Sequence, residues 1–278
     1  MEHLETNIVH YWLVGHPMIS QFEFKHRQTF GATLLFPILS ILIYLSFTLL
    51  SLRFPSLLPT VSAAALRCIT ATHSLILCIL SLIMAAGCAI SVLHEMATHA
   101  HNWNWIICYN ELNYENIFLR GPLAFWGYVF YLSKILEFLD TLLILLSSSR
   151  SRRLSFLHVY HHALVPLFCY VGVATGQSMW PAGVIINASV HVLMYAYYFL
   201  SAIGKRPRWK KLVTDVQIAQ FMFGIVCFGA VMYYHLTSEF GCSGIGVWFF
   251  TICFNVSLLA LFLNFHFKTY AKNNSKKA

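Results

Sequence analysis

Residues 68–93 read CITATHSLILCILSLIMAAGCAISVL, a run that contains no Asp, Glu, Lys or Arg. An α-helix needs roughly 20 apolar residues to cross a bilayer core about 30 Å thick, so this run predicts a membrane-spanning helix. The sequence has six further apolar runs. The run at 121–146 carries three charged residues, and the run at 158–175 is short. The sequence therefore predicts seven spans, at 30–52, 68–93, 121–146, 158–175, 181–203, 212–237 and 244–267.

The composition is typical of a polytopic α-helical membrane protein and excludes several other classes. Hydrophobic residues make up 58% of the 278 residues and charged residues only 10%, with a mean hydropathy of +0.66. Soluble globular chains carry about 25% charged residues, and disordered chains are poor in apolar residues. A membrane β-barrel would show short alternating segments. Without a linker or repeat, residues 1–278 are predicted to form a single domain.

The basic residues are distributed unevenly between the two sides of the predicted spans. Fourteen of the 18 lysines and arginines fall on the side that holds the C-terminal tail, whereas three fall on the other side. Cytoplasmic loops carry an excess of Lys and Arg. The C-terminus is therefore predicted to be cytoplasmic and the N-terminus not. Because most of the net charge of +8 flanks apolar runs, we expect no nucleic-acid partner.

Two clusters of ionisable residues interrupt the apolar runs. Lys134, Glu137 and Asp140 recur at helical spacing in the third run, followed by Thr141. They could form a structural ion pair between helices or a functional site, because charged groups at bilayer depth are costly and tend to be functional. The second cluster comprises three histidines within five residues, His158, His161 and His162. Such a group is typical of metal ligation or of acid, base or nucleophilic catalysis.

Two further clusters lie in the fifth and sixth runs. The fifth run carries a stripe of four residues on one helix face, His191, Met194, Tyr195 and Tyr198. The sixth run begins with Thr214, Asp215, Gln217 and Gln220. These polar groups could simply join helices by hydrogen bonds. The predicted topology, however, places all four clusters in the cytoplasmic half or near the midplane, where we expect them to converge on a cavity reached from the cytosol.

The order and spacing of these motifs resemble those of one family. The chain contains Lys134-x-x-Glu137-x-x-Asp140-Thr141, His158-x-x-His161-His162, His191-x-x-Met194-Tyr195-x-Tyr197-Tyr198 and Thr214-x-x-Gln217-x-x-Gln220. This pattern is similar to that of the ELO family of very-long-chain fatty acid elongases, the condensing enzymes of the endoplasmic reticulum. Asn264-Phe265-His266 departs from the family pattern, in which a tyrosine usually follows the phenylalanine. His10-Tyr-Trp-Leu-Val14 resembles the plant-like branch.

The resemblance implies a reaction and a location. Acyl-CoA and malonyl-CoA would give 3-oxoacyl-CoA, CO2 and CoA, with no bound cofactor or metal. The protein would be a multi-pass protein of the endoplasmic reticulum membrane, with its N-terminus in the lumen and an acyl-binding cavity between its helices. Its partners would be long-chain acyl-CoA, malonyl-CoA and membrane lipid. The reductases and dehydratase of the elongation cycle, and a second copy of the chain, are further candidates.

The resemblance also implies roles for single residues. His161 would carry the acyl group as an acyl-imidazole, because no cysteine lies in the polar clusters to act as nucleophile. His191 would face it and assist the condensation. Lys134 would pair with the carboxylates or with the malonyl group. The remaining residues would orient the imidazoles or stabilise the enolate: His158, His162, Glu137, Asp140, Gln217 and Tyr195.

Two other functions fit part of the sequence. Membrane di-iron desaturases and hydroxylases also use His-x-x-His-His, but they need about eight histidines on one side of the membrane. Here His94, His99 and His101 are predicted to lie on the opposite side from the His158 cluster. A seven-span transporter or receptor would explain the apolar runs, but it would not explain four polar clusters at one depth.

Two groups of residues outside these clusters, two cysteines and a set of basic residues, are candidates for a disulfide and for CoA binding. Six of the eight cysteines lie within or beside apolar runs, whereas Cys108 and Cys242 fall in loops that the charge distribution places in the lumen. That compartment is oxidising enough for disulfides, so these two either pair or remain free thiols.

Basic residues flank the expected cytoplasmic entrance and either set the topology or bind the CoA phosphates: Arg150, Arg152, Arg153, Lys205, Arg206, Arg208, Lys210 and Lys211.

Overall fold

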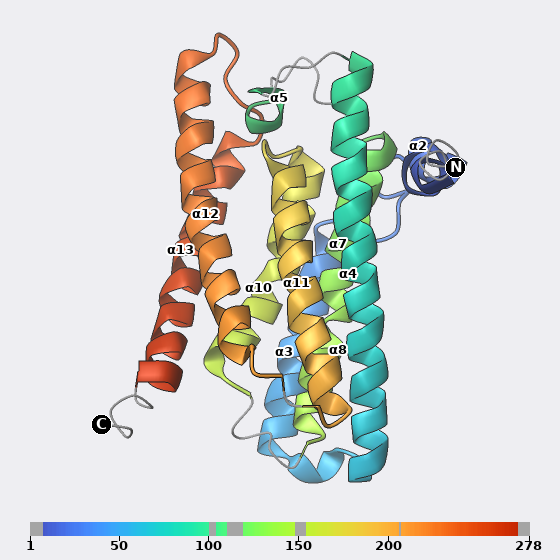
Figure 1. Cartoon of the computed structure of the whole chain (residues 1–278), viewed down its shortest axis with the longest axis vertical. Coiled ribbons are helices and arrows are strands. Elements are labelled where there is room, and N and C mark those ends of the chain that lie inside the picture. The colour runs from blue at the N-terminus through green and yellow to red at the C-terminus, as the bar shows by residue number, and fades with distance from the viewer. Residues whose placement is uncertain (1–7, 100–103, 110–118, 148–153, 206, 272–278) are drawn as a thin grey trace.

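The computed structural model describes residues 8–99, 104–109, 119–147, 154–205 and 207–271, which are helical throughout apart from turns and one isolated bridge between Glu23 and Arg120. Eight longer helices form the body (Figure 1): α3 Leu35–Arg53, α4 Ala63–His99, α7 Gly121–Leu136, α8 Phe138–Leu145, α10 Phe156–Thr175, α11 Trp180–Ala202, α12 Lys210–Thr237 and α13 Ile245–His266. Short helical turns precede or connect them: Tyr11–Gly15, α2 Pro17–Ser20, Pro55–Leu57, α5 Asn104–Ile107 and Phe267–Ala271.

Six of these helices in the described part of the chain are long and apolar enough to cross a membrane, namely α3, α4, α10, α11, α12 and α13. The predicted third span, at 121–146, is not the single helix that we expected. It divides at Glu137 into α7, of 16 residues, and α8, of 8 residues. The Asp140 amide donates to the Glu137 carbonyl at 3.0 Å, a three-residue spacing that tightens the backbone where the two helices meet.

Among the other helices, the observed ends differ most from the ends of the predicted span in α4. This helix has 37 residues and extends beyond both ends of the predicted 68–93 span, so its length is about 55 Å at 1.5 Å per residue. His94, which we expected in a loop, lies within α4 and contacts His10 through their ring nitrogens at 3.2 Å. Hydropathy locates the apolar centre of such a helix but does not mark where its polar extension ends.

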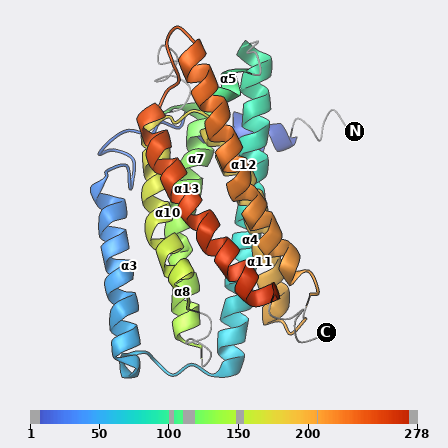
Figure 2. The same ribbon diagram turned by 90° about the vertical axis from the view of Figure 1, so that its left-hand side faces the viewer.

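The helices run roughly along one axis, and Figures 1 and 2 show their arrangement. α4 packs against α11 and α7, and α7 packs against α10. α3 packs against α10 and α8, whereas α12 and α13 pair with each other and contact α11 and α10 respectively. One end of the bundle holds Arg53, Arg67, Lys205, Lys210 and Lys211, and we call it the basic end. We call the opposite end the disulfide end, because it holds the bond described below.

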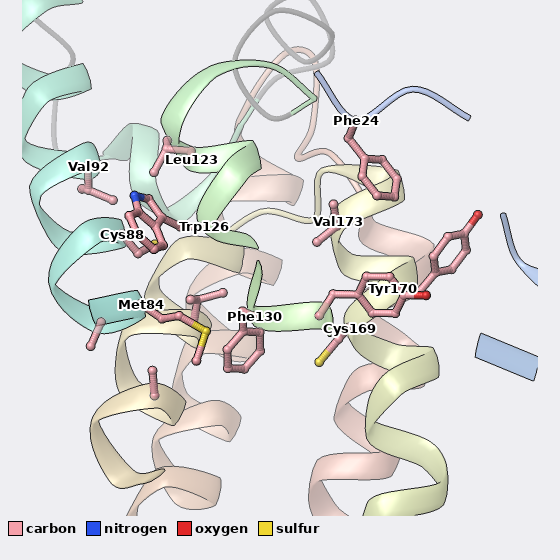
Figure 3. Close-up of a cluster of buried hydrophobic side chains, with 14 of the residues drawn as sticks. Phe24, Met84, Cys88, Val92, Leu123, Trp126, Phe130, Cys169, Tyr170 and Val173 are labelled. Carbon is pink, nitrogen blue, oxygen red and sulfur yellow. The ribbon is translucent and has the colours of Figure 1, made fainter. Parts of the chain in front are cut away.

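The larger cluster of buried apolar side chains lies in the half of the bundle toward the disulfide end, and Figure 3 shows some of its members. Met84 and Cys88 of α4, Phe130 of α7 and Val173 of α10 are among its buried members. Two tryptophans fit against glycines there. Trp126 lies over Gly87, and Trp180 lies between Gly127 and Gly172, where an added Cβ would meet the indole of Trp180. Small residues let membrane helices approach closely, so these contacts fix the spacing of α4, α7 and α10.

The outer faces of the helices are strongly apolar. Ile43 of α3 is 69% exposed, Val226 of α12 is 68% exposed and Phe250 of α13 is 72% exposed. Contiguous exposed apolar surface of this extent is not tolerated in water. A hydrocarbon environment around these helices accounts for it, in agreement with a multi-pass membrane protein.

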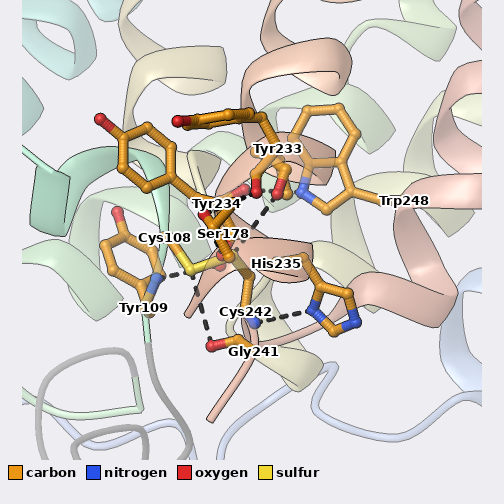
Figure 4. Close-up of a disulfide and its surroundings, with 11 residues drawn as sticks. Cys108, Tyr109, Ser178, Tyr233, Tyr234, His235, Gly241, Cys242 and Trp248 are labelled. Carbon is orange, nitrogen blue, oxygen red and sulfur yellow. Dashed lines mark hydrogen bonds between the residues drawn. A yellow bond between two sulfur atoms is a disulfide. The ribbon is translucent and has the colours of Figure 1, made fainter. Parts of the chain in front are cut away.

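A covalent bond joins two loops at the disulfide end (Figure 4). Cys108 and Cys242 form a disulfide with a Cα–Cα distance of 4.9 Å, which is the pairing considered from the sequence. Hydrogen bonds surround it. The Ser243 amide donates to the Tyr109 carbonyl at 2.7 Å, and the Trp248 indole donates to the Ser178 carbonyl at 3.0 Å. The bond therefore connects the segment after α4 to the connection between α12 and α13.

We expect the disulfide to be both detectable and stabilising. In detergent-denatured protein without reductant, maleimide should label the cysteines at other positions but neither Cys108 nor Cys242. Cys242→Ser should lower the free energy of unfolding by about 2–4 kcal/mol, because the bond closes a long loop of the unfolded chain. Cys253→Ser, at an exposed free thiol of α13, is the matched control. Full labelling of both cysteines without reductant would contradict the assignment.

Candidate active site

A buried charged cluster lies where α7 meets α8. Lys134 and Glu137 are 2% and 3% exposed, and the Lys134 Nζ donates to Glu137 Oε1 at 2.8 Å. The Lys134 ammonium also donates to Asn187 Oδ1 at 3.1 Å. From α11, His191 Nδ1 lies 3.2 Å from the same Glu137 oxygen. Lys134 of α7 and His191 of α11 thus share the carboxylate of Glu137, which lies at the joint between α7 and α8.

The contacts of Lys134 and Glu137 offset part of the cost of burying their charges. Isolated ions are very unfavourable in an apolar interior, whereas a pair with further hydrogen bonds is tolerated. The ring of Phe130 lies 4.3 Å from Lys134 Nζ and adds a cation–π contact. If His191 donates its Nδ1 proton to Glu137, its Nε2 lone pair is free to accept a proton or a hydrogen bond. Both Glu137 Oε1, at 3.2 Å, and Lys134 Nζ, at 3.5 Å, contact this Nδ1, so the cluster fixes the place of the His191 ring.

The three box histidines occupy the first two turns of α10. His158 Nε2 lies 2.8 Å from the Thr141 hydroxyl, which also contacts the Tyr44 hydroxyl of α3 at 3.1 Å. The His158 and His162 rings pack with their centroids 4.3 Å apart. These contacts fix His158 and His162 against α8 and α3.

His161 differs from each of its two neighbours in one respect. His158 is hydrogen-bonded to Thr141 and His162 is buried, whereas His161 is half-buried and makes no hydrogen bond to any of the described residues. Its ring meets that of His162 edge to face, with the centroids 5.2 Å apart. It lies close enough to Glu137, His191, Lys134 and His158 to interact with them electrostatically. A partly exposed imidazole that makes no hydrogen bond to the described residues is available to a substrate. Of the three box histidines, His161 therefore has the surroundings best suited to a nucleophile.

Asp140 lies at the start of α8 and bridges two other helices. Its Oδ1 lies 3.0 Å from His73 Nε2 of α4, and its Oδ2 accepts a hydrogen bond from the Tyr195 hydroxyl of α11 at 2.7 Å. The Tyr195 ring in turn contacts that of His191, with centroids 5.6 Å apart. This interaction connects the supporting residues Asp140 and Tyr195 to His191.

The fourth cluster separates into an inner and an outer part. Gln220 accepts a hydrogen bond from Asn187 at 3.4 Å, and Gln217 contacts the Met194 sulfur at 3.5 Å. Asp215 points away from these groups and is 40% exposed, where it pairs with Lys211 and His266 at 2.7 and 3.0 Å. Gln217 and Gln220 thus join α12 to α11, whereas Asp215 joins α12 to the end of α13.

The structure adds three residues that the sequence motifs did not identify, namely Tyr44, His73 and Asn187. Tyr44 and His73 lie on α3 and α4, far in sequence from the residues they contact. His73 could have been found as an ionisable residue within the most apolar run. Nothing in the sequence around Tyr44 distinguishes it from other tyrosines in apolar segments.

The residues expected to bind CoA are only partly described. Arg150, Arg152, Arg153 and Arg206 lie outside the described residues. Lys210 and Lys211 are exposed at the start of α12, at the basic end. The structure also has an apolar groove of about 410 Å³ between α4 and α11, lined by residues that include Arg67, Cys68, Leu75 and Phe199. It lies on the outer surface and none of the cluster residues lines it, so it is not the cavity that the motifs were expected to enclose.

Metal ligation was one interpretation of the histidine box. Among the residues whose placement is described, no group of three or more His, Cys, Asp and Glu side chains is arranged to hold a metal ion. The contacts of His158 with Thr141, and of His191 with Glu137, are those of a hydrogen-bonded polar network.

Comparison with known proteins decides the family. The sequence model of the ELO family, described as GNS1/SUR4 family, matches residues 29–278. The chain belongs to the ELO family. Fatty acid elongase A of Dictyostelium discoideum is 32% identical to it over 268 residues, which cover 93% of this chain and 92% of that protein.

Two other relatives come from a plant and a mammal. Fatty acid elongase 3-like of Arabidopsis thaliana is 26% identical over 276 residues, covering 95% of this chain and 93% of its own. Very long chain fatty acid elongase 2 of Rattus norvegicus is 36% identical over 165 residues, which cover 57% of this chain and 56% of the rat protein. The ELO match contains all four polar clusters, from Lys134 to Gln220.

The buried ion pair of this ELO-family chain leads to a stability prediction. Glu137→Gln should lower the free energy of unfolding by about 3–5 kcal/mol, because it leaves the Lys134 ammonium buried without its counter-ion. The double variant Lys134→Met with Glu137→Leu should recover part of this loss, because it removes both charges, and yet remain inactive. Denaturant unfolding in detergent measures the first effect.

The exposed pair between Lys211 and Asp215 provides the matched control. Asp215→Asn should change the free energy of unfolding by less than about 1 kcal/mol, because exposed ion pairs contribute little. An equal loss of unfolding free energy in Glu137→Gln and Asp215→Asn would show that the buried ion pair contributes no more to stability than the exposed one.

Proposed function

We propose that the protein is the condensing enzyme of fatty acid elongation, which converts acyl-CoA and malonyl-CoA to 3-oxoacyl-CoA, CO2 and CoA. Membership of the ELO family supports this function, and so do the elongase names of relatives that align over nearly the whole chain. The observation that carries the mechanism is the half-buried imidazole of His161, which makes no hydrogen bond to the described residues and interacts electrostatically with Lys134, Glu137 and His191.

The first half of the proposed reaction transfers the acyl group to His161. An imidazole nitrogen attacks the thioester carbonyl, a carbon–nitrogen bond forms and the carbon–sulfur bond breaks. CoA leaves as a thiolate that takes up the proton released from the imidazole. This covalent step divides one difficult condensation into two easier reactions.

The second half uses malonyl-CoA. Its carbon–carbon bond to the carboxylate breaks, CO2 leaves and the electron pair remains as an enolate. The enolate carbon attacks the acyl carbon on His161, the carbon–nitrogen bond breaks, and the imidazole regains a proton from solvent. Lys134 and His191 would stabilise the developing negative charge, since preoriented donors in a dry site contribute strongly to rate. His158, His162, Glu137, Asp140, Tyr195 and Gln217 would hold this arrangement in place.

We infer that the chain crosses the membrane seven times, with its N-terminus in the lumen of the endoplasmic reticulum and its C-terminus in the cytosol. α7 and α8 together have a length of about 36 Å, which is enough for one crossing. Lys205, Lys210 and Lys211 lie at one end of the bundle and the disulfide lies at the other, as the positive-inside rule and an oxidising lumen require.

The proposed substrates and partners follow from this topology. The CoA phosphates would bind Lys210 and Lys211 at the basic end, together with Arg150, Arg152 and Arg153, which lie outside the described residues. The acyl chain would extend among the apolar helices. The reaction involves no change of oxidation state that would require a bound cofactor. The enzymes that reduce and dehydrate the product would act next, and a homodimer is a further proposal.

The direct test is activity of the purified full-length chain. Protein in detergent or vesicles, given a panel of acyl-CoAs and labelled malonyl-CoA, should release CoA and CO2 and form 3-oxoacyl-CoA. Release of neither from any acyl-CoA by folded protein would refute the function. Iron bound in stoichiometric amount, with oxygen-dependent modification of the acyl chain, would support a desaturase or hydroxylase instead.

We expect His161 to carry the acyl group. After incubation with acyl-CoA alone, intact-protein mass spectrometry should show the mass of one acyl chain added to the wild-type protein. His161→Ala should lose this adduct, whereas His191→Ala should keep the adduct and lose condensation. An undiminished adduct in His161→Ala would refute the assignment of the nucleophile.

We expect the basic end to contribute to acyl-CoA binding. Replacement of both Lys210 and Lys211 by Gln should raise the apparent KM for acyl-CoA about three- to tenfold at low salt, because each exposed charge contact contributes up to about 1 kcal/mol. The effect should fade at high salt. Lys25→Gln, on the other side of the predicted spans, is the control, and an unchanged KM in the double variant would remove both lysines from the site.

A further inference from the structure

His73 is the one histidine in the apolar run 68–93 of α4, which has no Asp, Glu, Lys or Arg, and the four sequence motifs do not include it. Its side chain is 10% exposed, so it lies inside the bundle. Polar groups at this depth need partners, because there is no water in the hydrocarbon core to satisfy them. The question is what its interaction with Asp140 achieves.

His73 belongs to a connected series of contacts that ends at His191. Its Nε2 lies 3.0 Å from Asp140 Oδ1, and the other carboxylate oxygen accepts the Tyr195 hydroxyl at 2.7 Å. Tyr195 is fully buried, and its ring contacts the His191 ring at 5.6 Å, with the two planes 65° apart. α4, α8 and α11 are thereby joined through one carboxylate.

Each contact in the series constrains the next. Asp140 has two oxygens and, among the described residues, one hydrogen-bonding partner on each. Without His73, the carboxylate would lose its partner on α4 and could rotate toward another donor. The Tyr195 hydroxyl would then lose its fixed acceptor, and the Tyr195 ring would no longer be held against the His191 ring. Glu137 would still contact Nδ1 of His191 but could not define the tilt of its ring.

We propose that His73 is a positioning residue for His191, acting through Asp140 and Tyr195. The role rests on the proposed function, in which His191 assists condensation and His161 carries the acyl group. No hydrogen bond or ring contact in the described part of the chain connects His73, Asp140 or Tyr195 directly to His161. Loss of His73 should therefore impair the condensation half-reaction selectively.

The two half-reactions are measured separately. His73→Leu should form the acyl adduct from acyl-CoA within about twofold of the wild-type rate. Its preformed adduct should then react with malonyl-CoA at least about tenfold more slowly, because small displacements of a reacting group can cost up to a hundredfold. His73→Gln keeps an amide N–H near the position of Nε2 and should restore most of the condensation rate. His94→Leu, another histidine of α4, should leave both half-reactions unchanged.

A second variant and a double-mutant cycle test whether His73 acts on His191 through Asp140 and Tyr195. Tyr195→Phe keeps the ring but removes the hydroxyl, so it should show the same selective defect even if His73→Leu does not fold. If His73 acts through Asp140, then Asp140→Asn combined with His73→Leu should be little slower in condensation than Asp140→Asn alone. Additive losses would place His73 outside this series of contacts.

The outcomes distinguish the role of His73 from the proposed function. A wild-type protein that forms no adduct or no product refutes the function, and this role of His73 with it. A wild-type protein that performs both steps, with condensation by His73→Leu and Tyr195→Phe at the wild-type rate, refutes the positioning role alone. An equal loss of both half-reactions, accompanied by a lower thermal stability, shows that His73 only supports the fold.

Discussion

The ion pair between Lys134 and Glu137 is the constraint on which the rest of the site depends. Both groups are buried at the joint between α7 and α8, where a single uncompensated charge would cost several kcal/mol. The surrounding residues are arranged around them. Asn187 accepts from the ammonium and His191 contacts the carboxylate, so the pair determines how α11 must lie against α7. The same joint turns Asp140 and Thr141 toward α4, α11, α10 and α3.

Polar contacts and apolar packing have different tasks in this bundle. The half toward the disulfide end is held by shape, with Trp126 against Gly87 and Trp180 between Gly127 and Gly172. The half toward the basic end is held by hydrogen bonds among Thr141, His158, Asp140 and Tyr195. Hydrocarbon offers little hydrophobic driving force between helices, so close approach and hydrogen bonding are the means that remain. The site is therefore located where side-chain polarity, not shape alone, specifies the helix arrangement.

The sequence predicted the helices and the residue types of the site. It predicted less well which of these residues contact one another across helices. Long apolar runs identify spanning helices because the bilayer imposes their length. The spacing of Lys134 and Glu137 placed both on one helix face, and an ion pair was one of the two interpretations of that cluster. The division of the 121–146 segment was missed, because no proline or glycine marks Glu137. Tyr44, His73 and Asn187 were also missed. Their partners come from other helices, and helix pairing is not encoded in the periodicity of either helix alone.

The bond between Cys108 and Cys242 has a mechanical consequence for α12. It fastens the connection at the end of this 28-residue helix to the segment after α4, so any outward swing of α12 must pivot near that point. At 1.5 Å per residue the helix is about 42 Å long, and a tilt of about 10° would move its far end by about 7 Å. The displacement is greatest at Lys210 and Lys211, where the cross-helix contact between Asp215 and His266 is partly exposed to solvent. Because the covalent bond lies at the disulfide end, any tilt of α12 would change its distance from the neighbouring helices most at the basic end.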